Sequence, residues 1–288
     1  MFRRRLMPMI EAFQPDVIIT THPFVTEMIS YLKEEGKLDA LLLCVMTDYG
    51  PHKTWLSSRV DAYIVSNEDM AQDMVQLMGV PKEKVYPFGI PVHDVFFEKG
   101  DKQAILRELG LDENKATILV MAGSFGVNNI LAMFREMTSL PQDFQLIIIT
   151  GRNQKLYQAF EEEIKTSPKP CHLVFFTNEV EKYMKAADLL VTKPGGLTIS
   201  EALACNIPLA VFDAIPGQEE DNANFLMNHG MAVRIPKGEG CAATIQELLE
   251  NREKLIQMKE SCERFDKSRS IPNMLDLINR LLQEKGEA

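Results

Sequence analysis

Short apolar runs rich in β-branched residues recur along the chain, and stretches with the periodicity of amphipathic helices separate them. Near-continuous apolar strands that alternate with helices are typical of parallel sheets covered on both faces. The pattern therefore predicts an α/β protein built of doubly wound, Rossmann-like units. The expected strands cover residues 17–20, 41–46, 62–65, 117–121, 145–150, 172–176, 189–192, 207–211 and 232–235.

A segment at 87–98 breaks this periodicity with two prolines and a glycine, as a linker between domains would. A length of 288 residues also fits two domains. We expect a Rossmann-like domain at 1–90, a second at 91–270, and a C-terminal helix at 271–288 that could pack back on the first. Because few strands fall before residue 90, the first domain is expected to be incomplete or small.

The charge balance and the apolar runs exclude several classes of protein. With 31 basic and 41 acidic residues the net charge is −10, the wrong sign for a protein that grips nucleic acid by its phosphates. No apolar run approaches the roughly 18 residues of a membrane span, so a cytoplasmic location is expected. Arg3, Arg4 and Arg5 could touch an anionic membrane surface or form the solvated face of a helix.

The five cysteines are widely spaced and include no C-x-x-C pair. This spacing predicts reduced thiols rather than disulfides or a structural zinc site.

Loops that follow the strands are the places to look for a ligand, because doubly wound sheets bind ligands at the carboxyl ends of their strands. The loop at 123–126 offers two glycines for close backbone approach and the hydroxyl of Ser124 before a helix. It lacks the third glycine of a dinucleotide fingerprint, and no acid follows the next strand. It is either an anion-binding loop or a tight turn.

The loop at 192–201 carries the strongest signal. Gly195 and Gly196 keep side chains away from a helix N-terminus, whose N–H groups and dipole attract phosphate, and Thr198 adds a hydroxyl. A pyrophosphate would fit there without a metal. Glu201 could accept hydrogen bonds from a ribose diol, or form a capping box with Thr198.

Two further loops complete the set. The loop at 212–222 is rich in carboxylates and amides, which suits sugar hydroxyls, although a solvated loop capped by Asp221 or Asn222 would look the same. The loop at 176–180 could present backbone groups to the edge of a base.

Several motifs together resemble a known family. They are the stretch 45–49 followed by His52 and Trp55, the triplet 151–153, the loop from Lys193 through Glu201, and the stretch 216–219. The chain is similar, along nearly all its length, to the diacylglycerol glycosyltransferases of the GT-B fold. This family includes plant monogalactosyldiacylglycerol synthases and bacterial processive glucosyltransferases, with the MurG-type transferases as relatives.

The resemblance implies a UDP-sugar donor bound by the second domain, with uracil near 177–180, ribose on Glu201 and the transferred sugar near Gln218 and Glu219. No cofactor is implied, and without a D-x-D motif a metal has no obvious ligands. The implied donor-binding residues are Gly123, Ser124, Phe125, Gly126, Arg152, Asn153, Thr177, Asn178, Val180, Lys193, Pro194, Gly195, Gly196, Thr198, Glu201, Gln218 and Asn222.

The acceptor side of the family pattern is less complete. Family members carry a glycine-rich loop with a histidine as the proposed base, and this sequence contains no such loop. The chain is therefore expected to begin after that point, with the missing part lost or supplied by a partner. His22, at the end of a strand, could act as the base or be a structural histidine. Trp55 could form an apolar lip for lipid beside His52, or be a core residue.

These observations predict an inverting glycosyltransferase that moves a hexose from a UDP-sugar to diacylglycerol at the inner face of the membrane, with His22 and Glu219 as candidate catalytic residues. Two alternatives stay open. One is a UDP-sugar-binding module that is inactive without a further polypeptide. The other is a GT-B UDP-N-acetylglucosamine 2-epimerase. The sequence does not separate UDP-glucose from UDP-galactose.

Overall fold

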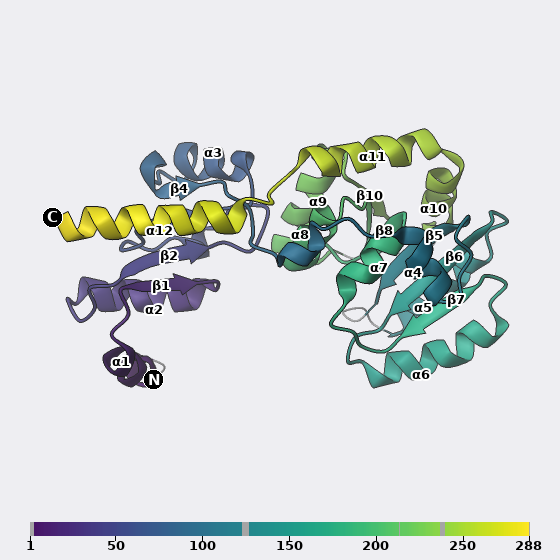
Figure 1. Cartoon of the computed structure of the whole chain (residues 1–288), viewed down its shortest axis with the longest axis horizontal. Coiled ribbons are helices and arrows are strands. Elements are labelled where there is room, and N and C mark those ends of the chain that lie inside the picture. Colours follow the sequence, from purple (N-terminus) through teal and green to yellow (C-terminus); the bar gives the residue numbers. More distant parts are fainter. Residues whose placement is uncertain (1–2, 123–126, 213, 237–239, 288) are drawn as a thin grey trace. The chain divides into compact units, whose positions relative to one another are not determined.

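The computed structural model describes residues 3–122, 127–212, 214–236 and 240–287 (Figure 1). The chain divides into two compact units, each of which is described by itself. Unit 1 comprises Met1–Pro91 and Lys267–Ala288, and unit 2 comprises Val92–Asp266.

Unit 1 contains a four-stranded parallel sheet in the order β1-β2-β3-β4. Val17 of β1 pairs with Leu41 of β2, and Leu43 of β2 pairs with Ala62 of β3. The strands are β1 Val17–Thr20, β2 Leu41–Val45, β3 Ala62–Ile64 and β4 Val85–Tyr86, and the helices are α1 Arg3–Phe13, α2 Pro23–Glu34, η1 Lys53–Trp55, α3 Glu68–Gln76, η2 Lys82–Lys84 and α12 Ser270–Glu287.

Successive residues of β2 face two different apolar clusters, because side chains alternate along a strand. Leu42 packs in a cluster with Leu32 of α2 and Met74 of α3. Leu43 packs in a second cluster with Leu277 of α12. The sheet is therefore covered on both faces, and the C-terminal helix α12 supplies the cover on one of them (Figure 1).

The two segments that enter and leave unit 1 are fixed to each other within it. The Ser270 hydroxyl donates to the carbonyl of Gly89 over 2.8 Å, and the Lys267 ammonium donates to the carbonyl of Pro87 over 3.2 Å. Gly89 has a φ of +93°, and a Cβ there would lie 2.7 Å from the Cβ of Lys267. Both the left-handed backbone and the close approach require glycine at this crossing.

Unit 2 contains a six-stranded parallel sheet in the order β10-β9-β8-β5-β6-β7. The strands are β5 Ala116–Met121, β6 Phe144–Ile149, β7 Cys171–Val174, β8 Leu189–Thr192, β9 Leu209–Phe212 and β10 Ala232–Ile235. The helices are η3 Asp94–Phe96, α4 Lys102–Glu108, α5 Val127–Thr138, α6 Gln154–Glu163, η4 Ile164–Thr166, α7 Val180–Ala186, α8 Gly196–Ala204, α9 Gln218–Asn228, α10 Cys241–Glu250 and α11 Arg252–Arg264.

All pairings in both sheets are parallel, which confirms the α/β class expected from the apolar runs. Each strand expected from the sequence is present among the described residues, and the two-residue strand β4 adds to them. The carboxyl ends of the unit 2 strands therefore meet at one edge of the sheet. The chain passes from β5 outward to β7 and then returns to place β8 on the other side of β5.

Candidate active site

The return of the chain past β5 creates a topological switch point between β5 and β8. Loops after neighbouring strands diverge at such a point and leave a crevice in which α/β proteins bind ligands. Val120 of β5 pairs with Val191 of β8, so both strands end at the same level of the sheet. The loop after β8 contains Gly195 and Gly196. The loop after β5, with Gly123, Ser124, Phe125 and Gly126, lies outside the described residues.

The N-terminus of α8 is open. Gly195 is its N-cap and provides no side-chain hydrogen bond, and a Cβ at Gly195 would meet nothing within 4 Å. The amide groups of Gly196, Leu197 and Thr198 donate no hydrogen bond to any described residue. Three N–H groups with the positive end of the helix dipole behind them form a ready site for an anion.

The capping box that the sequence allowed between Thr198 and Glu201 is not formed. Because α8 begins at Gly196, Thr198 lies within its first turn and Gly195 takes the cap position. The carboxylate of Glu201, half-buried in the next turn, accepts no hydrogen bond from the described residues. Burial raises the pKa of the Glu201 carboxyl, and the nearby charge of Glu181 adds to the rise. Two hydroxyl donors from a ligand would stabilise its ionised form.

The loop before α9 is held in place by its own side chains. Gly217 has a φ of +102°, a conformation open to glycine, and caps α9 without a side-chain bond. The Glu219 carboxylate accepts a hydrogen bond from the amide of Ile215 over 2.8 Å. Gln218, the first residue of α9, follows directly after the cap.

Asn222 lies deeper than the sequence suggested. Its side chain is 1% exposed, and its amide donates to the carbonyl of Pro194 over 3.0 Å. This bond joins α9 to the loop that precedes α8. Asn222 is therefore placed to support the two loops, while Lys193, Gly195 and Gly196 beside Pro194 are partly exposed.

The ends of β6 and β7 form an exposed platform. The guanidinium of Arg152 lies 4.4 Å from the ring centroid of Phe176, which is 42% exposed. The Thr177 hydroxyl accepts from the amide of Glu179 over 2.9 Å and shapes the following turn. Phe176 belongs to the loop at 176–180 for which the sequence predicted contacts through backbone groups, and the structure adds a possible role for its ring, since an exposed aromatic face beside a guanidinium suits stacking.

Three of the implied donor residues at this end of the sheet differ in their surroundings. Asn153 caps α6 by accepting from the amide of Leu156 over 3.1 Å, so its side-chain oxygen is engaged in the fold. Asn178 is exposed, and Val180 is the half-buried first residue of α7.

The two candidate histidines of unit 1 both cap helices. His22 follows β1, is exposed, and its Nδ1 accepts from the amide of Phe24 over 3.3 Å. His52 caps η1 in the same way, with its Nδ1 3.3 Å from the amide of Thr54. A neutral histidine that accepts at Nδ1 carries its proton on Nε2. To act as a base, His22 must therefore release the amide of Phe24.

Trp55 is a core residue, the alternative that the sequence had left open. Its side chain is 2% exposed and packs in the cluster of β2, α2 and α3. It presents no surface to a lipid.

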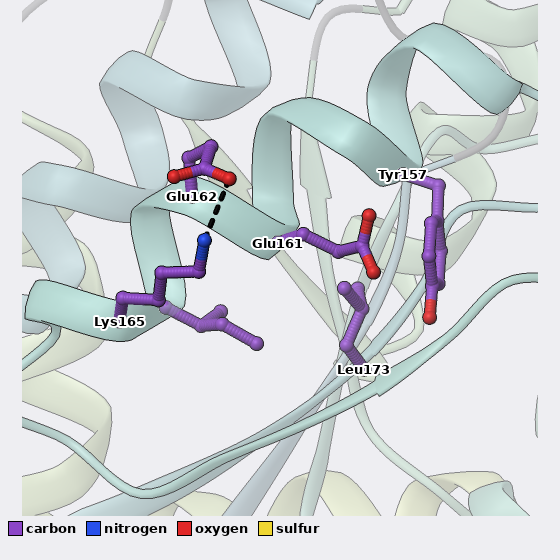
Figure 2. A pocket seen from close by; sticks show the side chains of 6 residues that line it. Tyr157, Glu161, Glu162, Lys165 and Leu173 are labelled. Carbon is purple, nitrogen blue, oxygen red and sulfur yellow. Dashed lines mark hydrogen bonds and ion pairs between the residues drawn. The ribbon is translucent and has the colours of Figure 1, made fainter.

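A shallow pocket lies along α6 and β7, lined by Tyr157, Glu161, Glu162, Lys165 and Leu173 (Figure 2). Glu162 and Lys165 form an ion pair of 2.7 Å across one turn at its rim. Glu161 and Glu162 lie in the C-terminal half of α6, Lys165 lies in η4 and Leu173 lies in β7, away from the loops at the carboxyl edge. Tyr157, near the start of α6, lies closer to that edge, because its ring centroid is 5.5 Å from that of Phe175, which directly follows β7.

Comparisons with known proteins agree with this geometry. Residues 1–92 match the monogalactosyldiacylglycerol (MGDG) synthase family, and residues 117–274 match the glycosyltransferase family 28 C-terminal domain. A processive diacylglycerol beta-glucosyltransferase of Bacillus pumilus is 30% identical over 278 residues, which cover 96% of this chain and 72% of the relative. The chain belongs to the diacylglycerol glycosyltransferase family.

Solved structures place this family member in the GT-B fold. MurG of Acinetobacter baumannii matches with a TM-score of 0.69 at 14% identity, over 96% of this chain and 77% of MurG. A UDP-GlcNAc 2-epimerase of Neisseria meningitidis, bound to UDP-GlcNAc, matches with a TM-score of 0.69 at 15% identity, over 96% and 80% of the two chains. At this identity the likeness concerns the fold, and it confirms the GT-B class expected from the sequence.

Proposed function

We propose that this chain transfers a hexose from UDP-glucose or UDP-galactose to diacylglycerol with inversion at the anomeric carbon. The observation that carries the proposal is the N-terminus of α8 at the switch point, whose first amide groups have no acceptor among the described residues. The carboxylate of Glu201, which accepts no hydrogen bond from those residues either, lies one turn further along the helix. This spacing suits a diphosphate followed by a ribose. Family membership supports the same donor and acceptor classes.

The reaction needs a base for the acceptor hydroxyl and groups that stabilise the departing diphosphate. The acceptor hydroxyl attacks the anomeric carbon while the bond from that carbon to the UDP oxygen breaks, and the hydroxyl proton passes to a base. Negative charge develops on the departing diphosphate, where the amide groups of Gly196, Leu197 and Thr198 can stabilise it. The dipole of a helix is already oriented toward this charge, whereas water molecules would have to reorient to stabilise it.

Several other residues at the carboxyl edge of the unit 2 sheet have a proposed role. The ring of Phe176 and the guanidinium of Arg152 offer a stacking surface for uracil, with the turn at Thr177 beside its edge. Gln218 and Glu219, at the start of α9, are proposed to contact the hexose. Asn222 is proposed to set the spacing between α9 and the diphosphate loop through Pro194.

The direct test is a transfer assay with labelled UDP-glucose and UDP-galactose, each offered vesicles with and without diacylglycerol. The proposal expects a labelled glycolipid that appears only when diacylglycerol is present. The binding-module alternative would instead be supported if the chain binds UDP but transfers no sugar, and if transfer appears once a polypeptide with the family's glycine-rich histidine loop is added. Conversion of UDP-N-acetylglucosamine alone would support the epimerase alternative.

We also propose that α1 and the start of α2 contact the membrane that holds the acceptor. None of the described helices is long and apolar enough to cross a membrane. Met9 and Phe13 of α1 are 68% and 83% exposed, and Phe24 of α2 is 66% exposed. The arginines at positions 3–5 suit an anionic surface.

Vesicle flotation tests this contact. Replacing Phe13 with Ser should reduce binding to vesicles that contain anionic lipid, because a large apolar side chain no longer enters the interface. Leu77, the C-cap residue that follows α3 and is 74% exposed in the same unit, supplies the matched control. Equal flotation of wild type, Phe13→Ser and Leu77→Ser would contradict the assignment of this surface.

A further inference from the structure

The orientation of α9 is fixed by two opposite faces of the helix. Gln218 and Asn222 are four residues apart and share one face, as do Glu220 and Asn224. At about 100° per residue, the two faces are separated by roughly 200° around the helix axis. Asn222 ties the first face to Pro194. A second tie on the other face would prevent rotation of the helix about its axis.

Arg234 provides that second tie. It lies on β10, the edge strand on which α9 packs (Figure 1). Its two terminal nitrogens donate to the two oxygens of Glu220 over 3.0 and 2.7 Å, and one of them also donates to the Asn224 side chain over 3.2 Å. The side chains of Arg234 and Glu220 are 37% and 40% exposed, so water only partly screens the pair.

The geometry of this contact depends on a guanidinium. A planar fork matches both carboxylate oxygens at once, whereas an ammonium is a point charge without a preferred plane. The bond therefore fixes direction as well as distance. The N-terminus of α9 has no side-chain cap at Gly217 that could do this instead.

We propose that Arg234, through Glu220, is a positioning residue that sets the angle at which the first turn of α9 presents Gln218 and Glu219 to the sugar of the donor. The inference rests on the proposed function, because it needs a hexose at that turn. It assigns to Arg234 an effect on the sugar half of the donor and none on the UDP half, which binds at α8. Small displacements of a positioning group are enough to weaken recognition.

The test compares Arg234→Lys with a matched control. Arg135 of α5 also forms a forked pair, with Glu163 of α6, and one of its bonds is 2.9 Å long. Because helices run opposite to the strands they connect, this pair at the ends of α5 and α6 lies at the amino edge of the sheet, away from the donor loops. Arg135→Lys therefore disturbs a similar pair in the same unit without touching α9.

Calorimetric titration of UDP, UDP-glucose and UDP-galactose into the whole chain gives the readout. For Arg234→Lys we expect unchanged UDP affinity and an affinity for the UDP-hexose lowered by about fivefold, the upper range for a partly exposed ion pair. Glu220→Gln should give the same split, and Arg135→Lys should leave all the affinities unchanged.

The outcomes separate the two proposals. If the wild type binds neither UDP nor a UDP-hexose, the proposed function fails and the inference fails with it. If the wild type binds them but Arg234→Lys keeps the wild-type ratio of UDP to UDP-hexose affinity, the inference alone is overturned. A parallel loss of UDP affinity, or the same change in Arg135→Lys, would also overturn it, because the effect would then be general.

Discussion

The half-buried carboxylate of Glu201 lowers the stability of the fold when it is ionised, and it is available to accept hydrogen bonds from a ligand. Its carboxyl is half-buried, without a hydrogen-bond partner among the described residues, and near Glu181. A folded-state pKa above the ordinary value means that ionisation opposes folding, and this opposition grows as pH rises from the ordinary pKa through the raised one. Such a group is typical of a binding site, where stability is lost in favour of recognition.

The variant Glu201→Gln tests both effects, the one on stability and the one on UDP binding. The variant should be more stable than the wild type at neutral pH, and the difference should vanish below the ordinary pKa of a glutamate, since both side chains are then neutral. UDP affinity should fall by roughly 10-fold or more, because a charged acceptor is lost. Urea unfolding at the two pH values and calorimetry measure these effects, with the exposed Glu253→Gln as control. Equal stability at both pH values would contradict the account.

The role of His22 as a helix cap cannot be predicted from its residue type. His22, His52 and His93 each accept, through Nδ1, the amide two residues ahead. In the sequence His22 and His52 are candidates for the acceptor side, with a structural role left open for His22, and no cap is predicted at either, because histidine is not among the preferred N-cap residues. The same difficulty applies to Trp55, whose surroundings depend on contacts distant in sequence.

His22→Asn separates a cap from a base. Asparagine keeps the capping oxygen, so the melting temperature should stay near that of the wild type. If His22 is the base that takes the acceptor proton, the transfer rate should fall by about 100-fold. His93→Asn, the matched cap in unit 2, should change neither quantity. A wild-type rate in His22→Asn would leave His22 as a cap only.

At the scale of elements, the sequence is most informative where a run is long and its period clear. The strands of both sheets follow from their apolar runs, and β5 and β6 are each six residues long. β4 has only two residues, too few for a period, and depends on its pairing with β3. The T-x-x-E pattern at 198–201 allowed a capping box as an alternative, and α8 does not form it, because the helix begins earlier, with Gly195 as its N-cap.

The helix α12 offers a test of packing at this scale. Leu277 is 3% exposed against β2, whereas Leu275, two residues earlier, is 53% exposed. Leu277→Ala should destabilise unit 1 by about 2–5 kcal/mol, the usual range for a buried leucine. Leu275→Ala should change stability by less than about 0.5 kcal/mol. Chemical unfolding of both variants measures the difference, and equal effects would contradict the assignment of α12 to the core of unit 1.

For the molecule as a whole, the candidate site could be predicted in position but not in detail. Parallel topology places every loop of interest at one edge, so the loops near Gly195, Gln218 and Thr177 could be found from strand ends alone. What the side chains do there depends on tertiary contacts: Asn222 turns inward to Pro194, and Phe176 stays exposed under Arg152. No local pattern contains those contacts.

We propose above that the N-terminus of α8 holds the diphosphate of the donor. Leu197, in its first turn, is 56% exposed, so substitution there leaves the core intact. Leu197→Asp adds a negative charge where the helix dipole favours it, and should therefore raise stability slightly while repelling a diphosphate. Leu197→Asn is the neutral control of nearly the same shape.

Calorimetric titration of UDP with a chelator present decides the matter. If α8 holds the diphosphate, the wild type and Leu197→Asn should bind UDP saturably, and Leu197→Asp should lose at least tenfold in UDP affinity despite equal or higher thermal stability. No heat from the wild type at millimolar UDP, or wild-type affinity in Leu197→Asp, would contradict the proposal.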